Sequence, residues 1–315
     1  MKKRNYLDFT LSKTVPYMRD IFIDEVYYAA KKNRDIFFTT PDMGAPSLDK
    51  FREELPKQFI HSGICEQHMI AMAAGLTLMK KKVFCYAMAP FITSRCYEQI
   101  KCSVAAMDQP VCLVGIGVGL GYADAGPTHY TTEDIATMRV FPNIEIITPS
   151  DVISMTVIIK DILKKPRFIF LRLDKDIMSN IYLGKNKFNL KNGFSKLIKG
   201  KKKCIISSGF LLNKIYKKLN LKNNKNIGLI DLYKIKPLNN KFLKEIIEYD
   251  EIITIEEQWV DGGFGSAILE FLSKNGIKMK VTRHGLKEKY YFENGGREYL
   301  HNKYGLNINK ILKSI

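Results

Sequence analysis

The sequence has 315 residues, enough for two domains with full hydrophobic cores, and a formal net charge of +18. Residues 1–175 contain 23 Lys and Arg against 19 Asp and Glu, whereas residues 176–315 contain 27 against 13. The lysines of the second part are scattered among Asn and Ile without interleaved aromatic residues, which argues against a nucleic-acid-binding protein. No stretch approaches the roughly 20 apolar residues of a membrane span and no apolar targeting segment is visible, so we expect a cytoplasmic protein without membrane contact.

In chain order, hydrophobic periodicity predicts alternating strands and helices in the first part of the sequence. The expected strands are 36–40, 57–62, 82–87, 111–115, 144–147 and 168–173. The expected helices are 20–32, 49–55, one that follows Glu66, and 91–107, 132–140 and 151–163. This alternation predicts an α/β domain over residues 1–180 with a doubly wound, mostly parallel sheet.

A polar connection rich in Lys and Asn follows, and we place a linker at residues 181–192. The second unit, residues 193–315, is predicted to be a smaller α/β domain. Its expected strands are 203–207, 227–231 and 251–255, and its expected helices are 211–219, 239–248 and 266–273.

The most informative segment is 63–76, GICEQHMIAMAAGL, which places Glu66 at a strand-to-helix corner. Open α/β sheets bind ligands at the carboxyl ends of their strands, so a carboxylate at this corner indicates a binding or acid–base site. The alternative is a carboxylate that only complements the positive end of the helix dipole. The flanking residues His61, His68 and Cys65 are interpreted first as packed side chains.

The remaining motifs give weaker signals. The glycine turn 115–121 lacks the GxGxxG spacing of a phosphate loop. The glycine turn 262–265 more often allows close helix packing than phosphate binding. The six cysteines show no metal-site spacing and are interpreted as reduced core residues: Cys65, Cys85, Cys96, Cys102, Cys112 and Cys204.

Nearly the whole sequence resembles a known family. Glu66, Ala71 and Gly75-Leu76 match the pyrimidine-binding segment of thiamine-diphosphate enzymes, and the resemblance continues through 86–100, 125–129, 133–143, 231–238 and 256–265. The sequence is most similar to the C-terminal half of transketolases and 1-deoxyxylulose-5-phosphate synthases. It is more distantly similar to the beta subunits of 2-oxoacid dehydrogenases.

The resemblance implies roles for particular residues. Glu66 would hydrogen-bond the pyrimidine ring of thiamine diphosphate and favour the tautomer that takes the C2 proton, so that Glu66 is a catalytic residue. Phe91 would stack on that ring, and Ile64 and Arg95 would complete the cofactor-binding set. His129, in the Gly-Pro-Thr-His turn, would bind the sugar and handle protons from its hydroxyls.

Two departures from the family concern the substrate. Transketolases carry an Asp directly before the Gly-x-Thr-His turn, where this sequence has Ala125, with Asp124 one residue earlier. In the family the glycine turn lines the substrate side, so the resemblance implies a flexible wall at residues 115–121. This turn lacks the basic residue that holds a sugar phosphate, which leaves Arg172 as the matching phosphate ligand. We therefore predict that Asp124, His129 and Arg172 contact the substrate. The two departures favour a modified or nucleotide-linked keto sugar as that substrate.

The family's Gly-Asp-Gly…Asn motif, which holds the diphosphate through a divalent ion, does not occur in the sequence. The resemblance therefore implies the C-terminal subunit of a split transketolase, with no metal ligands of its own. An N-terminal partner subunit would carry that motif and magnesium or calcium, in an α2β2 heterotetramer that transfers a two-carbon ketol unit. The alternatives are a beta subunit that decarboxylates a 2-oxoacid or forms an acyloin, and a non-catalytic assembly module.

Overall fold

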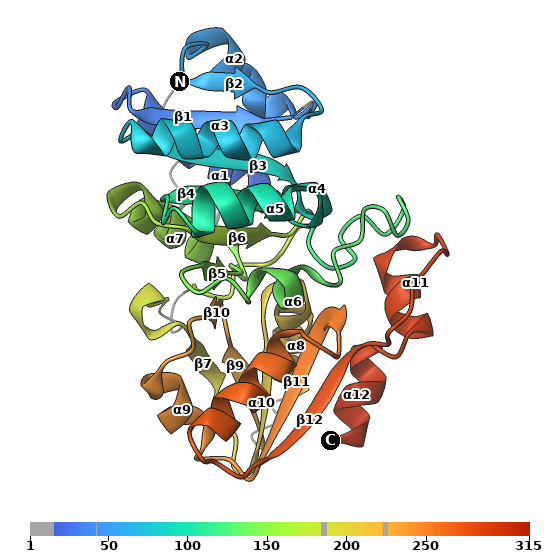
Figure 1. Ribbon diagram of the computed structural model, residues 1–315. Helices are drawn as coiled ribbons and strands as arrows, with labels where there is room; N and C mark the ends of the chain where they lie inside the picture. The colour runs from blue at the N-terminus through green and yellow to red at the C-terminus, as the bar shows by residue number, and fades with distance from the viewer. Residues whose placement is uncertain (1–15, 42, 184–187, 223–225) are drawn as a thin grey trace.

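Two sheets, one in each half of the chain, organise the structure, and helices pack on their faces (Figure 1). The computed structural model describes residues 16–41, 43–183, 188–222 and 226–315. The first 15 residues and part of the predicted linker 181–192 lie outside this range. The alternation of strands and helices confirms the predicted α/β class.

The first sheet has seven described strands in the order β10-β5-β6-β4-β3-β1-β2, and its neighbours are parallel except for β10. The strands are β1 (Ile36–Thr40), β2 (Phe59–His61), β3 (Lys82–Met88), β4 (Val111–Ile116), β5 (Glu145–Ile147), β6 (Ile169–Leu173) and β10 (Lys234–Lys236). Alternate residues of β3 enter opposite cores, Cys85 on one face and Phe84 on the other. Both faces of the sheet are therefore buried, as in a doubly wound fold.

Helices cover both faces of this sheet. On one face α1 (Met18–Ala30) packs against α7 (Val152–Lys164), which begins at a capping box between Asp151 and Ser154, and α3 (Glu66–Leu78) packs on the other face. The shorter segments are η2 (Pro46–Leu48), α2 (Asp49–Glu54), α4 (Ala89–Ile92), η3 (Ser94–Cys96), α5 (Tyr97–Gln99), η4 (Ile100–Ala105) and α6 (Asp134–Met138). Within the described ranges, no helix combines the length and the apolar content needed to cross a bilayer.

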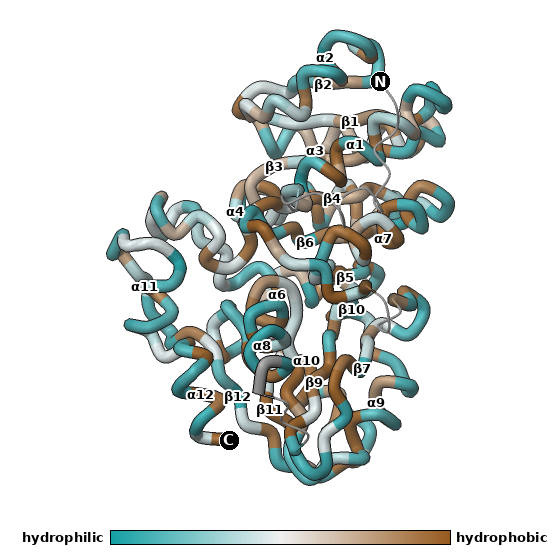
Figure 2. The backbone as a smooth tube through the Cα atoms, turned by 180° about the vertical axis from the view of Figure 1, so that it is seen from behind, coloured by the Kyte–Doolittle hydropathy of each residue, from teal (hydrophilic) through white to brown (hydrophobic). Residues whose placement is uncertain are grey.

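The second sheet has five described strands in the order β12-β11-β8-β9-β7, with β7 antiparallel to β9. The strands are β7 (Ser195–Ile198), β8 (Lys203–Ser207), β9 (Ile227–Asp231), β11 (Glu251–Trp259) and β12 (Lys280–Leu286). The helices are η5 (Leu190–Asn192), α8 (Gly209–Lys222), α9 (Asn240–Ile246), α10 (Phe264–Lys274), α11 (Gly296–Lys303) and α12 (Ile308–Ser314). Figure 2 shows apolar residues along the inner strands and hydrophilic residues over the outer turns.

The strand β10 joins the two halves of the molecule, a feature that the sequence analysis does not anticipate. It follows β9 of the second sheet, yet it pairs antiparallel with β5 at the edge of the first sheet, with Lys234 opposite Ile147. The backbone N–H of Thr148 also donates to the carbonyl of Tyr233, over 2.8 Å. The two sheets are thus connected by backbone hydrogen bonds as well as by side-chain packing.

The glycine turn 262–265 serves close packing, as predicted. The Glu256 carboxylate accepts the backbone N–H groups of Phe264 and Gly265, over 2.7 and 2.9 Å, at the start of α10. Any side chain at Gly263 would collide with that carboxylate. Burial raises the pKa of Glu256 to about 7, against the opposing effect of these two N–H donors.

Candidate active site

A pocket opens at the carboxyl ends of the three neighbouring strands β3, β1 and β2, where a doubly wound sheet is expected to bind ligands. Its volume is about 180 Å³. Its lining residues are Pro41, Met43, Ile64, Glu66, Met88, Phe91 and Arg95. The structure therefore brings together all four residues predicted to bind the cofactor.

Glu66 is the first residue of α3 and only 3% of it is exposed to solvent. Its Oε1 atom accepts a hydrogen bond from Nη1 of Arg95 over 2.8 Å. Its Oε2 atom is buried and has no hydrogen-bond partner among the described residues. A buried carboxylate oxygen without a donor is costly, so this atom fits a ligand that brings a hydrogen-bond donor into the pocket.

Phe91 and Arg95 enter the pocket because the helix predicted over 91–107 is broken. The break is at Thr93, whose backbone angles of −107° and −84° are not helical, and the chain continues as η3, α5 and the π-helix η4. The single-helix prediction is therefore wrong. The break places the Arg95 guanidinium 4.0 Å from the centre of the Phe91 ring, so both side chains frame one side of the pocket.

Ile64 lies on the turn between β2 and α3 and is 73% exposed. Gly63 before it has a φ of +68°, which glycine adopts without strain, and this conformation lets the chain turn into α3. An apolar side chain exposed at the mouth of a pocket suits a surface that a ligand or another chain covers.

His129 lies beside the pocket, on the segment between β4 and α6. Its ring is 5.3 Å from the ring of Phe91 and 6.1 Å from that of Tyr122, measured between ring centres, and both pairs are edge-to-face. Its Nδ1 atom is 2.9 Å from the hydroxyl of Thr128. The ring is therefore held where it can meet a molecule that stacks on or next to Phe91.

The other two predicted substrate residues lie elsewhere. Asp124 is exposed and pairs with Lys175 over 3.4 Å, and its pKa is lowered by its own backbone N–H and by Lys175. Arg172 is buried on β6, where it forms two hydrogen bonds with Asp134, of 2.7 and 3.1 Å, and one with Thr148. The structure does not place Arg172 among the residues that line the Glu66 pocket, so its contact with a substrate phosphate stays a prediction.

Several smaller expectations are corrected. His61, His68 and Cys65 are exposed rather than packed, and so is Cys102. Residues 116–121 of the glycine turn are buried, and its role as a flexible wall beside the substrate stays a prediction. The pocket is also lined by three residues that were not predicted, Pro41, Met43 and Met88. Pro41 and Met43 follow β1 and Met88 ends β3, which is a usable signal once the strand order is known.

In the described part of the chain, no group of three or more His, Cys, Asp or Glu side chains could hold a metal ion. The pocket offers one carboxylate, one guanidinium and apolar walls, which suits the flat ring of a cofactor better than its charged diphosphate.

Comparison with known families matches both halves of the chain. The family described as "Transketolase, pyrimidine binding domain" matches residues 15–179, and the one described as "Transketolase, C-terminal domain" matches residues 195–311.

The chain is similar over almost its whole length to short relatives. It is 29% identical to a subunit of the apulose-4-phosphate transketolase of Phocaeicola vulgatus, covering 94% of this chain and 95% of that protein. It is 28% identical to "Putative transketolase C-terminal section" of Methanocaldococcus jannaschii, covering 97% of each. It is 30% identical to "1-deoxy-D-xylulose-5-phosphate synthase" of Thermus thermophilus, where it spans 47% of that longer protein.

Solved structures give the same picture. The structure described as "Split gene transketolase, inactive beta4 tetramer" matches with a TM-score of 0.82 and 25% identity, over 94% of this chain and 96% of that one. A transketolase from Campylobacter jejuni matches in fold with a TM-score of 0.75 over 46% of its length. This chain thus matches almost the whole of the split-gene transketolase chain, but only about half of the Campylobacter jejuni transketolase.

Proposed function

This chain belongs to the transketolase family, a family of thiamine-diphosphate-dependent enzymes, and on that premise we propose that it is the C-terminal subunit of a split transketolase. In this proposal it transfers a two-carbon ketol unit from a ketose to an aldehyde, and it is active only with a partner subunit. The observation that carries the proposal is the Glu66 pocket: a buried carboxylate oxygen without a donor, beside an aromatic ring and a histidine.

The residues of this chain have distinct tasks in the proposal. When bound, thiamine diphosphate supplies the nucleophilic carbon that accepts and releases the ketol unit. Glu66 offers its Oε2 atom to a ring nitrogen of the cofactor, and Arg95 holds the carboxylate in place through Oε1. Phe91 supports the ring by stacking, and His129 binds a substrate hydroxyl and exchanges its proton.

The partner is proposed to be an N-terminal subunit with the Gly-Asp-Gly…Asn motif, which holds the diphosphate through magnesium. Support comes from relatives named as a transketolase subunit and as a C-terminal section, which this chain matches over 94–97% of its length. A pocket without metal ligands in the described residues is consistent with such a division. An α2β2 heterotetramer is the assembly we propose.

Calorimetry with thiamine diphosphate and magnesium tests this division. We expect weak binding to the isolated chain, and tight binding only when the partner subunit is added. Glu66→Ala should remove the tight binding or the turnover, whereas Glu54→Gln, which changes an exposed carboxylate on α2 outside the pocket, should not. Tight stoichiometric binding by the isolated chain would refute the split site.

The donor sugar is proposed to differ from ordinary pentose phosphates. Ala125 replaces the family's donor-binding Asp, Asp124 points to an ion pair with Lys175, and Arg172 is engaged with Asp134. Two contacts of the family are missing, from the donor-binding Asp and from the basic residue of the glycine turn, and each is worth roughly 1–3 kcal/mol. The kcat/KM for xylulose 5-phosphate should therefore be about 10²- to 10⁴-fold below that for the true donor. Apulose 4-phosphate and nucleotide-linked keto sugars are the first donors to assay, because of the named relative and of these departures.

The same assay separates the alternatives. Efficient turnover of xylulose 5-phosphate with ribose 5-phosphate would show an ordinary split transketolase. Turnover of pyruvate or another 2-oxoacid in place of a ketose would favour the 2-oxoacid beta subunit. A complex that binds no thiamine diphosphate would favour the non-catalytic assembly module.

A further inference from the structure

The segment 117–133, which connects β4 to α6 and carries His129, is held by the second half of the chain. Figure 1 shows it leaving the first sheet and extending towards α11. Its two ends pair at Gly119 and Thr131, and the backbone N–H of Trp259 donates to the carbonyl of Thr132 over 3.0 Å. The hydroxyl of Tyr130 donates to the carbonyl of Glu293 over 3.2 Å.

Apolar packing adds to these hydrogen bonds. Leu120 and Tyr130 are buried in the same cluster as Leu286, Tyr291 and Leu300 of the second half. The segment that places His129 beside Phe91 therefore takes its position from β11, β12 and α11, and not only from the sheet to which the pocket belongs.

Glu257, on β11, contacts the segment at its first turn. Its Oε2 atom lies 3.4 Å from the backbone nitrogen of Leu120, which donates to it. Gly119 has a φ of +63°, and any side chain at this position would collide with the Glu257 carboxylate. The turn can approach β11 this closely only because residue 119 is glycine.

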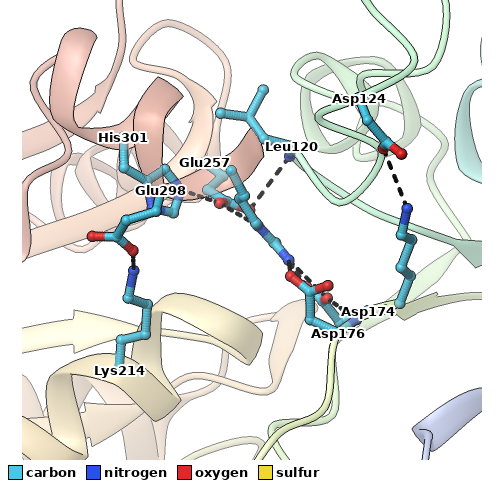
Figure 3. Close-up of polar contacts among 10 residues, drawn as sticks. Leu120, Asp124, Asp174, Asp176, Lys214, Glu257, Glu298 and His301 are labelled. Carbon is cyan, nitrogen blue, oxygen red and sulfur yellow. Dashed lines mark hydrogen bonds and ion pairs between the residues drawn. The ribbon is translucent and has the colours of Figure 1, made fainter. Parts of the chain in front are cut away.

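Arg297 of α11 fixes Glu257 in turn. Figure 3 shows Glu257 between Leu120 on one side and Asp174 and Asp176 on the other. The Arg297 guanidinium donates from Nε to Oε1 of Glu257 over 2.8 Å, and to both carboxylate oxygens of Asp174 over 2.8 Å each. It also bonds Asp176 over 2.8 Å and stacks over the Phe210 ring at 3.7 Å. The side chain is only 7% exposed, so these contacts are shielded from water and salt.

This cluster keeps Glu257 ionised although it is buried. Burial acts to raise the pKa of Glu257, but Arg297 and His301 outweigh that effect and hold the pKa below its usual range. Buried ion pairs are weak evidence for stability, whereas their geometry is strict because a partner that moves leaves a buried charge uncompensated. A strict geometry is what a positioning device needs.

We propose that Glu257 and Arg297 are positioning residues for His129. They lock the segment 117–133 onto the second half of the chain, and this contact sets where the His129 ring stands relative to the Glu66 pocket. The catalytic part of this inference rests on the proposed function, whereas the locking of the segment does not.

Two variants test the lock from opposite sides. Arg297→Gln weakens the charge cluster, and Gly119→Ala pushes the segment off Glu257 without removing any charged group of the cluster. Glu298→Gln is the matched control, because Glu298 is an exposed residue of α11 that pairs with Lys214 away from the segment.

Amide hydrogen exchange of the full chain, followed by mass spectrometry, gives a readout that is independent of activity. We expect peptides from 117–133 to exchange at least about tenfold faster in both variants, with peptides from β3 and β4 unchanged. Fluorescence of Trp259, the single tryptophan of the sequence, should shift as its neighbour Thr132 moves. Unchanged exchange of 117–133 in Gly119→Ala would overturn the proposal.

The assembled enzyme gives the second readout. We expect kcat/KM for the donor to fall at least about tenfold in Gly119→Ala while the affinity for thiamine diphosphate stays within about twofold, because the Glu66 pocket is built on other elements. Cofactor affinity and turnover that fall together would show a merely structural role and contradict the positioning of His129. If the wild-type complex binds no cofactor, the proposed function fails, and the exchange measurement still decides whether the segment is locked.

Discussion

The chain contains two Glu–Arg ion pairs with different roles, one in the proposed binding site and one that holds the structure together. In the pocket, Glu66 is buried and its partner Arg95 is 40% exposed, and one oxygen of Glu66 has no donor among the described residues. Between the two sheets, Glu257 and Arg297 are both buried, and Arg297 also binds Asp174. Glu66 thus keeps one oxygen available to a ligand, whereas both oxygens of Glu257 are occupied.

The electrostatic surroundings follow the same division. His301 and Arg297 together stabilise the charge on Glu257, while Glu66 is paired with the partly exposed Arg95. A ligand in the Glu66 pocket would therefore contact a carboxylate that Arg95 orients through one oxygen and whose other oxygen can still accept a hydrogen bond. Substitutions in the Glu66 pair should therefore change binding and turnover, whereas substitutions in the Glu257 pair should change stability.

Glu66→Gln should abolish turnover in the assembled complex, by at least about 10³-fold, because a positioned acid–base group is lost. The midpoint of thermal unfolding, followed by circular dichroism, should change little, since Gln can still accept a hydrogen bond from Arg95. Glu257→Gln is the matched substitution in the other pair, and we expect it to lower that midpoint instead. Turnover near the wild-type level in Glu66→Gln would remove Glu66 from the mechanism.

Arg297→Gln should lower the free energy of unfolding by about 3–5 kcal/mol, because it leaves Asp174 and Glu257 as buried charges without their cation. Urea unfolding of the isolated chain measures this loss. Arg52→Gln, which breaks the exposed pair with Asp49, should cost less than about 1 kcal/mol. Equal losses for the two arginines would mean that the buried cluster is not tightly formed.

Arg95→Gln should weaken the affinity for thiamine diphosphate about tenfold, or about 1.4 kcal/mol, because Glu66 loses the donor that orients it. Its stability should stay within about 1 kcal/mol, since Arg95 is partly exposed. Calorimetry on the complex measures the affinity. Arg95→Lys keeps the charge but not the planar guanidinium, so its affinity should lie between those of the wild type and of Arg95→Gln. An affinity that rises would show that Arg95 competes with the cofactor for Glu66.

Asp231 offers a third kind of buried carboxylate, with hydroxyl partners and no arginine. It accepts from Ser150 over 2.9 Å and from Tyr182 over 2.5 Å, and burial raises its pKa to about 8, against the opposing effect of these two hydroxyls. The folded chain therefore keeps a proton that the unfolded chain releases near pH 4. The stability from this proton is complete below about pH 4 and lost as the pH rises to about 8.

Thermal unfolding of the wild type and of Asp231→Asn across this window checks the sign. The wild-type midpoint should fall by a few degrees between about pH 5 and about pH 8, and the variant should show a smaller fall. An equal fall in both proteins would assign the pH dependence to other groups.

The sequence was sufficient for the regular parts of the fold, since β1, β8 and β9 occupy the predicted residues. Their β-branched and apolar runs are typical of buried strands. It was not sufficient for β10 and β12, whose alternating polar residues lie at edges of their sheets. Helix α11 was missed for a related reason, because it is mostly polar and buries charged side chains such as Arg297 rather than an apolar stripe.

The site was predictable where residues follow consecutive strands. Glu66 and Phe91 belong to local motifs, so their meeting in one pocket follows from the sheet order. The cluster of Arg297, Glu257 and Asp174 joins residues 40 and 123 positions apart, and no local pattern indicates such a contact. The break at Thr93 was equally hidden, because the segment 91–107 contains no Gly or Pro that would indicate the end of a helix.

The placement of β10 has a consequence for how the chain is made. The first sheet receives its last described strand from residues 234–236, after β7, β8 and β9 of the second sheet have passed. During synthesis on the ribosome, β5 would therefore present an unpaired edge until most of the second half has emerged, and such edges invite pairing with other chains. If the coding sequence were divided within residues 181–192, the first half would be made without β10, and the edge of β5 would stay unpaired. We therefore expect the two halves to be recovered together or not at all.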